Sequence, residues 1–204
     1  MYLFETMRLE NGHIPRETYH HKRIERSAHN LAIPFSTIKW QQLIDDIKVT
    51  HAQGCYRLKV MLSEAGVLSS ELGALTDKPH MTACLVQMAD DIPQWQRVNK
   101  TSERAFLQHH HQTDLVLFTN EHGKLLEFDI GNFVMEWQGQ LCTPRYQNDF
   151  LRGCMRQALL DNGEIVEADL TIDALAQAVE QHDKIWMINS LRAWVPVVFS
   201  HIDR

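Results

Sequence analysis

The spacing of apolar residues predicts two helices near the start of the chain. The first carries an apolar stripe of Tyr19, Ile24, Ala28 and Leu31, and the second follows the i, i+3, i+4, i+7 pattern with Trp40, Leu43, Ile44 and Ile47. The first helix is expected to begin at Pro15, because proline suits the first helical position, and to end near Asn30. Ser36 is expected to cap the second helix, and Gly54 to end it.

Strands are predicted where apolar and polar residues alternate. Residues 56–62 alternate in this way, and residues 81–88 form a second predicted strand. Between them, residues 64–79 carry Gly66, Gly73, Pro79 and several serines, a composition that is typical of turns. We therefore expect this stretch to separate two subdomains.

The second half of the chain continues the alternation and adds hairpins. We expect a helix near 102–112, strands at 114–118, 124–128, 133–137 and 140–143, a helix at 153–160, a strand at 164–167, a helix at 172–182, and strands at 185–188 and 194–199. Turns at 120–123 and at Gln138-Gly139 would connect the hairpins. The pattern predicts a mixed fold of the α+β or α/β class.

Composition and charge exclude several classes of protein. The chain has 204 residues, of which 44% are apolar and 23% charged, so wholesale disorder is excluded. The net charge of −6 disfavours a nucleic-acid surface, because phosphate binding needs clustered positive charge. No apolar run approaches the ~18 residues of a membrane span, and the first residues lack the regions of a signal peptide. We therefore expect a cytoplasmic protein that binds neither nucleic acid nor membranes.

Several common sites are also excluded. The four cysteines lie far apart without a Cys-x-x-Cys pair, which excludes a zinc ribbon. His109-His110-His111 lacks ligand spacing, because consecutive side chains of the predicted helix point about 100° apart and cannot bind one ion. We expect no metal site. The chain also has no P-loop, nucleophile elbow or dinucleotide-binding fingerprint.

A set of ordered fragments carries a more specific signal. The fragments are Phe4-Glu-Thr-Met-Arg8, His20-x-x-Arg23, Lys100-Thr-Ser-Glu-Arg104, Gly123-Lys-Leu-Leu-Glu127-Phe-Asp-Ile-Gly-Asn132, Thr143-Pro144, Leu151-Arg-Gly153-Cys-Met-Arg156 and Asn189-Ser190-Leu-Arg192-Ala-Trp194-Val-Pro196. In this order and spacing the chain resembles the class IV (fold type IV) pyridoxal-phosphate enzymes. That family includes aminotransferases for branched-chain and D-amino acids, and 4-amino-4-deoxychorismate lyase. The likeness is greatest to the lyase-like domain that is fused to some para-aminobenzoate synthases.

The resemblance implies pyridoxal 5'-phosphate as the cofactor and assigns residues to it. Lys100 would hold the cofactor aldehyde as a Schiff base and then transfer protons. Glu127 would keep the ring nitrogen protonated, which requires a buried carboxylate. Asn132 matches a further cofactor-site position and is expected to order the loop there.

The cofactor phosphate and the substrate are assigned to other residues. The resemblance assigns the phosphate to Arg23, to Ser190 and to the helix start at Gly153, Cys154 and Met155, since a helix N-terminus attracts anions, and it makes Asn189 a further cofactor-binding residue. The thiol of Cys154 is expected to be inert packing. Arginines bind carboxylates in a bidentate manner, and the candidates for substrate carboxylates are Arg8, Arg104 and Arg192. Each of these arginines also has an ordinary salt bridge as its alternative.

The resemblance further implies two α/β subdomains with the cofactor at their interface, in a homodimer. We expect a small N-terminal subdomain over residues 1–90, shorter than in relatives, and a larger cofactor-binding subdomain over 91–204. The glycine-rich arm of the stand-alone lyase is replaced by Ser63-Glu-Ala-Gly-Val-Leu-Ser69. Because of this difference, the resemblance does not identify the substrate, whereas it still implies the cofactor.

Three functions remain open at this point. The first is a lyase that releases pyruvate and 4-aminobenzoate from 4-amino-4-deoxychorismate, a step in folate synthesis. The second is a small aminotransferase that acts on D-amino acids or branched-chain amino acids. The third is a non-catalytic protein that retains the cofactor. We favour the lyase, because the arginines suit a dicarboxylate substrate.

Overall fold

The structure, a computed structural model, describes residues 1–76 and 78–199. Its contacts divide the described chain into two compact units. The first unit contains the chain up to Thr76 together with Asn99–Arg104, and the second contains Lys78–Val98 and the residues from Ala105 onwards. None of the helices in the described ranges has the length and apolar character that a membrane span requires.

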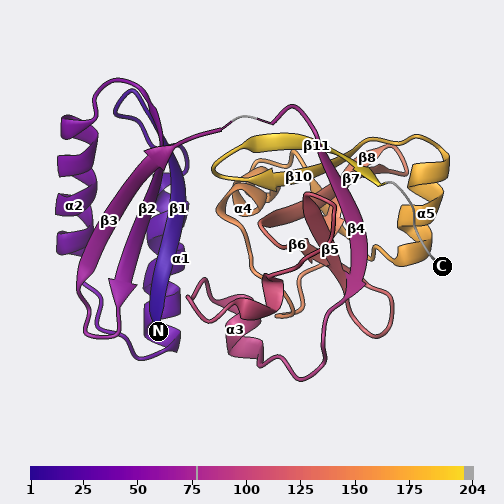
Figure 1. The fold of residues 1–204 in the computed structure, drawn as a ribbon, viewed down its shortest axis with the longest axis horizontal. Coiled ribbons are helices and arrows are strands. Elements are labelled where there is room, and N and C mark those ends of the chain that lie inside the picture. The colour runs from indigo at the N-terminus through magenta and orange to yellow at the C-terminus, as the bar shows by residue number, and fades with distance from the viewer. Residues whose placement is uncertain (77, 200–204) are drawn as a thin grey trace. The chain divides into compact units, whose positions relative to one another are not determined.

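The first unit is a three-stranded antiparallel sheet covered by two helices. The strands lie in the order β1 (Tyr2–Glu10), β2 (Cys55–Ser63) and β3 (Leu68–Ala74), and the helices are α1 (Glu17–Asn30) and α2 (Thr37–Thr50). Alternate residues of β1 and β2 are buried, and they share one apolar core with Ile24 of α1 and Trp40 of α2. Figure 1 shows these elements in indigo and purple.

The second unit contains an eight-stranded sheet in the order β10-β11-β4-β5-β6-β7-β8-β9. The strands are β4 (Met81–Gln87), β5 (Leu115–Thr119), β6 (Leu125–Phe128), β7 (Gly131–Trp137), β8 (Gln140–Pro144), β9 (Val166–Ala168), β10 (Ile185–Asn189) and β11 (Ala193–Phe199). Because β10 pairs with β7 as well as with β11, the strands from β10 round to β7 close into a barrel. The barrel is visible in Figure 1.

Short helices accompany this barrel. They are α3 (Gln94–Val98), the single 3₁₀ turn η1 (Ala105–Leu107), α4 (Cys154–Asp161) and α5 (Ile172–Glu180). Side chains of α5 pack against the main core of the barrel, whereas Met155 and Leu159 of α4 form a smaller apolar cluster with Val134 and Ile188. This arrangement confirms the predicted mixed class and places α4 against β7 and β10.

Most of the predicted elements are present within a few residues of their expected bounds. The Ser36 hydroxyl caps α2 by accepting from the Lys39 amide at 3.4 Å, as predicted. The first helix starts later than expected, at Glu17, because Arg16 adopts a left-handed conformation with φ of 61°. Gln138 and Gly139 both have positive φ, as a tight hairpin turn between β7 and β8 requires.

Two parts of the prediction are wrong. The helix expected near 102–112 is only the three-residue turn η1, and α3 forms earlier instead. The turn-rich stretch 64–79 contains strand β3, whose residues are mostly exposed and show no apolar alternation. Backbone hydrogen bonds to β2 define β3, and a pattern search for a buried face cannot find such a strand.

The expected boundary at residue 90 also differs from the division in the structure. β4 belongs to the second unit, because it pairs with β5 and β11 there. Residues 99–104 belong to the first unit, because they run along the edge of β1. Leu3 and Thr101 form an antiparallel bridge, and the Ser102 amide donates to the Tyr2 carbonyl at 2.8 Å.

Candidate active site

The predicted site residues are divided between the two units. Arg8, Arg23, Lys100 and Arg104 belong to the first unit, and Glu127, Asn132, Gly153, Cys154, Met155, Asn189, Ser190 and Arg192 belong to the second.

Lys100 lies in the segment that runs along β1. Its carbonyl accepts from the Phe4 amide at 3.0 Å, and its Nζ lies 4.9 Å from the centroid of the Phe4 ring. The flanking residues Asn99 and Thr101 are both buried. The backbone on both sides of Lys100 is therefore fixed, as is needed for an amine that must react at a defined position.

Arg23 lies on the buried side of α1 and is paired with Glu5 of β1. Arg23 Nε donates to Glu5 Oε1 at 2.8 Å, Arg23 Nη2 donates to Glu5 Oε2 at 2.5 Å, and His20 Nδ1 lies 2.6 Å from Glu5 Oε2. Burial alone would raise the pKa of Glu5, but the charge and hydrogen bonds of Arg23 and the hydrogen bond from His20 lower it to about 2. Arg23 is thus not part of a solvated basic face of the helix.

The other two arginines of the first unit differ in their surroundings. Arg8 Nε donates to Glu10 Oε2 at 2.9 Å in an exposed ion pair, so the ordinary salt bridge weighed for Arg8 is present. Arg104 is half-buried at the end of the segment that begins at Asn99. Arg104 remains a candidate for a substrate carboxylate.

Glu127 is buried in β6, with 3% of its surface exposed. Its Oε1 accepts from the Leu151 amide at 3.0 Å, and its neighbours Leu126 and Phe128 are also buried. Glu127 therefore does not point into solvent, as a glutamate near the end of a strand could do. A buried carboxylate is the group that a protonated pyridine nitrogen requires as a partner.

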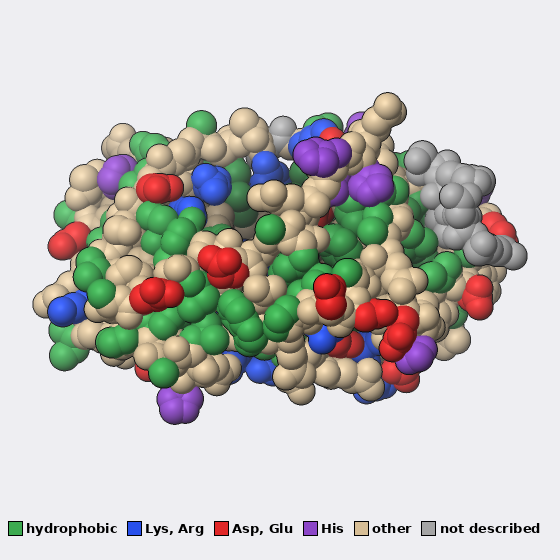
Figure 2. All heavy atoms as spheres, turned by 60° about the horizontal axis from the view of Figure 1, so that its bottom comes forward, with side chains coloured by type: hydrophobic (Ala, Val, Ile, Leu, Met, Phe, Trp, Pro, Cys, Tyr) green, Lys and Arg blue, Asp and Glu red, His purple; other side chains and the backbone are tan. Residues whose placement is uncertain are grey.

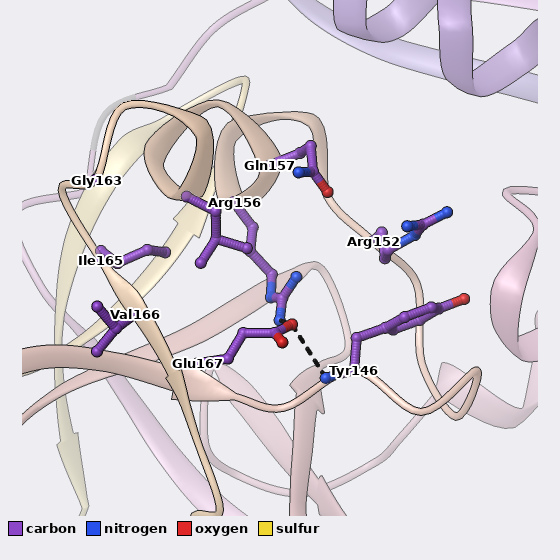
Figure 3. Close-up of a pocket in the computed structure, with 9 residues that line it drawn as sticks. Tyr146, Arg152, Arg156, Gln157, Gly163, Ile165, Val166 and Glu167 are labelled. Atoms are coloured by element: carbon purple, nitrogen blue, oxygen red, sulfur yellow. Dashed lines mark hydrogen bonds and ion pairs between the residues drawn. The ribbon is translucent and has the colours of Figure 1, made fainter.

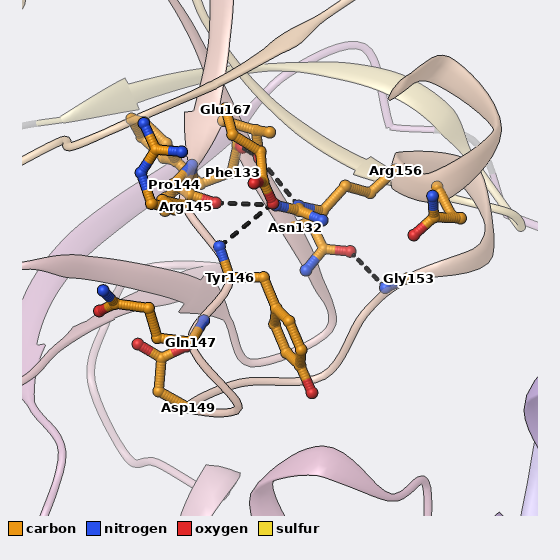
Figure 4. A network of polar contacts seen from close by, with 12 residues as sticks. Asn132, Phe133, Pro144, Arg145, Tyr146, Gln147, Asp149, Gly153, Arg156 and Glu167 are labelled. Carbon is orange, nitrogen blue, oxygen red and sulfur yellow. Dashed lines mark hydrogen bonds and ion pairs between the residues drawn. The ribbon is translucent and has the colours of Figure 1, made fainter. Parts of the chain in front are cut away.

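Asn132 connects this strand pair to the start of α4. It faces Glu127 in the β6–β7 ladder, and its side-chain amide binds the backbone twice; the contact with Gly153 is drawn in Figure 4. Asn132 Nδ2 donates to the Leu151 carbonyl at 2.9 Å, and Asn132 Oδ1 accepts from the Gly153 amide at 2.9 Å. The side chain therefore orders the segment from Leu151 to Gly153, as the sequence led us to expect.

Gly153 is needed at this position because of the close approach of Asn132. A Cβ atom on Gly153 would lie 2.1 Å from Asn132 Oδ1, which is far inside contact distance. Helix α4 then begins at Cys154, and Cys154 and Met155 are both buried. Amides in the first turn of a helix cannot find acceptors within the helix, so this end can bind an anion.

Arg156 holds α4 to the two neighbouring strands, a role that was not expected from the sequence. The side chain is buried, and Figure 4 shows its guanidinium among β8, β9 and the following loop. It donates to Thr143 Oγ1 at 3.3 Å, to the Pro144 carbonyl at 2.8 Å and to Glu167 Oε1 at 2.6 Å. Glu167 Oε1 also accepts from the Tyr146 amide at 3.1 Å.

An open pocket of about 590 Å³ lies beside α4 and β9 (Figure 3). Arg156 and Glu167 form part of its lining, and Arg152 lies over the Tyr146 ring at 4.7 Å from the centroid. None of the predicted site residues is among the described residues that line it. This pocket therefore does not identify the cofactor site.

The turn after β10 presents Ser190 and Arg192 from a fixed backbone. Asn189 Oδ1 accepts from the amides of Leu191 and Arg192 at 3.0 and 2.7 Å, and Asn189 Nδ2 donates to the Ile130 carbonyl at 3.1 Å. Asn189 thus orders the turn through its side chain. Ser190 is buried and Arg192 is half-buried.

The histidine run is not helical, so the reason given for excluding it as a metal site does not hold. Residues 108–111 have no regular secondary structure, and His109 Nε2 lies 3.6 Å from Asp129 Oδ2. Among the described residues, none of His109, His110 and His111 belongs to a cluster of ligand atoms that could bind a metal ion.

Comparison with known proteins identifies the family. The sequence matches the family model for class IV amino-transferases over residues 2–198. The chain belongs to this family. Its members depend on pyridoxal 5'-phosphate, and this chain is a pyridoxal-phosphate-dependent enzyme of fold type IV. No curated protein sequence matches the chain.

Solved structures agree with this assignment. A candidate amino-acid aminotransferase from Mesorhizobium loti is similar, with a TM-score of 0.80 and 26% identity over 97% of this chain and 99% of that one. A candidate 4-amino-4-deoxychorismate lyase from Haemophilus somnus has a TM-score of 0.77 and 23% identity, with 94% and 97% coverage. A hypothetical aminotransferase from Mycobacterium tuberculosis, solved with pyridoxal phosphate bound, has a TM-score of 0.82 and 18% identity, with 100% and 83% coverage.

The residues of this chain fit the cofactor chemically. Glu127 is a buried carboxylate that matches a protonated ring nitrogen, and the start of α4 matches a phosphate. Arg23 adds a buried positive charge and Lys100 adds an amine on a fixed backbone. The chain therefore contains every donor type that pyridoxal phosphate requires.

Proposed function

We propose that this enzyme is a 4-amino-4-deoxychorismate lyase, which releases pyruvate and 4-aminobenzoate for folate synthesis. One observation carries the proposal: the chain contains both Lys100-Thr-Ser-Glu-Arg104 and Asn189-Ser-Leu-Arg192-Ala-Trp194. These segments resemble the lyase-like domain of fused para-aminobenzoate synthases. Candidate lyases from Haemophilus somnus and Legionella pneumophila also share the fold.

The proposal gives each residue a defined task. Lys100 Nζ would hold the cofactor at rest and, once the amine of the substrate has displaced it, would take the proton from the aminated carbon of the substrate. Glu127 keeps the ring nitrogen protonated, while Arg23 and the start of α4 bind the phosphate. When bound, pyridoxal phosphate supplies an electron sink next to the substrate carbon that loses its proton.

Arg104 and Arg192 are assigned to the substrate. 4-Amino-4-deoxychorismate presents one carboxylate on its ring and one on its enolpyruvyl arm, and arginine pairs with carboxylates through two parallel hydrogen bonds. Orientation by two such pairs would direct the substrate proton towards Lys100 Nζ. Loss of pyruvate needs no second substrate, because proton removal and departure of the leaving group occur on one molecule.

An aminotransferase is the second candidate. It is favoured by the likeness to the candidate amino-acid aminotransferase from Mesorhizobium loti, at 26% identity and nearly equal chain length. In that reaction Lys100 would move a proton between the substrate carbon and the cofactor, and a keto acid would then accept the amino group.

Two assays on the cofactor-loaded protein separate these candidates. The first supplies 4-amino-4-deoxychorismate and measures pyruvate with a coupled dehydrogenase, and the second measures amino-group transfer to keto acids. The proposal predicts pyruvate release that is lost in Lys100→Ala. Transfer without pyruvate release would favour the aminotransferase, and neither activity in fully loaded protein would favour the non-catalytic alternative.

The proposal also includes a cytoplasmic homodimer. Several large apolar side chains of the described residues remain exposed, among them Ile38, Val49 and Val67 in the first unit. Figure 2 shows apolar side chains on one face of the molecule. Such side chains are available for contact with a second copy, and light scattering should give about twice the chain mass of 23.7 kDa.

A further inference from the structure

Glu5 is a charged residue at a position where strand β1 otherwise presents apolar side chains. The buried residues of β1 alternate as Leu3, Glu5, Met7 and Leu9. Glu5 thus faces the core of the first unit, with only 1% of its surface exposed. A carboxylate at a core position is costly unless it is fully paired, so its presence calls for an explanation.

The pairing of Glu5 is unusually complete. Both carboxylate oxygens bind Arg23, through Nε at 2.8 Å and Nη2 at 2.5 Å, and His20 Nδ1 lies 2.6 Å from Oε2. The pKa of Glu5 is lowered to about 2, against the effect of burial, because of the Arg23 charge and these hydrogen bonds. Glu5 is therefore a carboxylate at neutral pH, and His20 Nδ1 must donate to it.

Stability alone does not account for the buried cluster of Glu5, Arg23 and His20. An apolar group of similar size in place of a buried ion pair is often neutral or stabilising, because the charges no longer have to be desolvated. What an apolar residue cannot do is fix the plane of a guanidinium. The two-point contact from Glu5 sets the orientation of Arg23, and His20 one turn earlier in α1 binds the same carboxylate.

We propose that Glu5 is a positioning residue that holds the Arg23 guanidinium ready for the cofactor phosphate. This inference rests on the proposed function, which assigns Arg23 to that phosphate. Glu5 holds Nε and Nη2 of Arg23, so the rotamer of the guanidinium is already fixed before a phosphate binds. Binding then costs less side-chain entropy than binding by a mobile arginine.

The test compares two ligands that differ only in the phosphate: pyridoxal 5'-phosphate and pyridoxal. Equilibrium binding to the apoprotein is measured from the change in absorbance, for the wild type, Glu5→Gln and Arg23→Lys. Glu17→Gln is the matched control, because it removes a half-buried ion pair of the same helix, that with Lys48 at 2.9 Å. Thermal unfolding of each apoprotein confirms that it is folded.

The expected result is a loss that depends on the phosphate. Glu5→Gln should lower the affinity for pyridoxal 5'-phosphate by about tenfold or more and change that for pyridoxal by less than about twofold. The double variant with Arg23→Lys should lose little more than either single variant, because the residues act as a unit. Glu17→Gln should bind both ligands as the wild type does.

Other outcomes have distinct meanings. Equal losses for both ligands in Glu5→Gln, or no loss for either, would overturn the positioning role while leaving the proposed function intact. A wild-type protein that does not bind pyridoxal 5'-phosphate more tightly than pyridoxal would overturn both. If Glu5→Gln does not fold, Glu5→Asp takes its place. This variant keeps the charge but shortens the side chain by one methylene, and the same loss of affinity for pyridoxal 5'-phosphate relative to pyridoxal is expected.

Discussion

At the scale of single residues, Glu127 shows how the site combines structure with chemistry. One carboxylate oxygen accepts from the Leu151 amide, and the side chain is buried among apolar neighbours. A glutamine in its place retains an oxygen that can accept the same hydrogen bond. The change therefore removes the charge without leaving the Leu151 amide unpaired.

The substitution Glu127→Gln should consequently leave folding nearly intact and damage the chemistry. We expect the cofactor to bind more weakly, by about 1.5–3 kcal/mol for one lost charge-assisted contact, and turnover to fall further. Absorbance titration measures the first effect and steady-state assay the second, with thermal unfolding as the control. Turnover equal to that of the wild type would remove Glu127 from the assigned role.

Other residues show which roles could be predicted from the sequence and which could not. Asn132 and Gly153 are predictable, because they stand in motifs whose order and spacing are visible in the chain. Glu5 and Arg156 also stand in those motifs, yet neither was given a role. Glu5 acts on Arg23, which lies 18 residues away, and Arg156 binds Glu167, which lies 11 residues away. These contacts form only when the chain folds.

At the scale of elements, α4 is fixed by the side chain of Arg156 in its first turn. The arginine joins the helix to Thr143 and Pro144 of β8 and to Glu167 of β9. Burial lowers the pKa of Arg156, and Glu167 opposes this effect. The helix N-terminus that is assigned to the phosphate therefore depends on a buried polar network.

Replacing Arg156 by methionine should destabilise the protein by about 3 kcal/mol, because it removes three hydrogen bonds of a buried guanidinium and leaves the half-buried Glu167 without its counter-ion. The matched control is Arg145→Met, which breaks an exposed pair with Asp169 at 2.9 Å and should cost less than about 1 kcal/mol. Urea unfolding of both variants measures the difference. Similar losses in the two variants would show that the network does not stabilise α4.

Elements with a buried face were predicted well, and elements without one were not. Helix α2 and strands β2 and β4 carry apolar residues at the period of their structure, and each was found near its predicted position. Strand β3 is mostly exposed, so its residues carry no such period. The helix predicted at 102–112 is replaced by the single turn η1, and Ser102 at its expected start pairs with β1 instead.

At the scale of the whole molecule, the buried Glu5 links stability to pH. Its pKa is about 2 in the folded protein, below the ordinary value of 4.5. A carboxyl with a lowered folded pKa contributes stability above its unfolded pKa and loses it as the pH falls through the folded value. The contribution is therefore complete at neutral pH and disappears between about pH 4.5 and pH 2.

The wild type should accordingly lose more stability on acidification than Glu5→Gln does. We expect the difference in unfolding free energy between the two proteins to be on the order of a few kcal/mol at pH 7 and to shrink steadily below pH 4.5. Chemical unfolding at a series of pH values measures it. A difference that stays constant from pH 7 to pH 3 would contradict the assigned pKa.

The organisation into two units was predictable in outline, but their bounds were not. β4 lies before the predicted boundary and belongs to the second unit, while Lys100 lies after it and belongs to the first. Strand pairing decides both cases, and pairing between distant segments leaves no local signal in a single sequence. The segment with the proposed reactive lysine is therefore located by its contacts with β1.

One measurement tests the role of Lys100 most directly. Reduction of the cofactor-loaded protein with borohydride fixes the cofactor to the amine that holds it, and mass spectrometry of the peptides then identifies the lysine. We predict a label on Lys100 and none on Lys59, whose Nζ lies 5.3 Å from the same Phe4 ring. A label on another lysine, or no label with the cofactor in excess, would contradict the account.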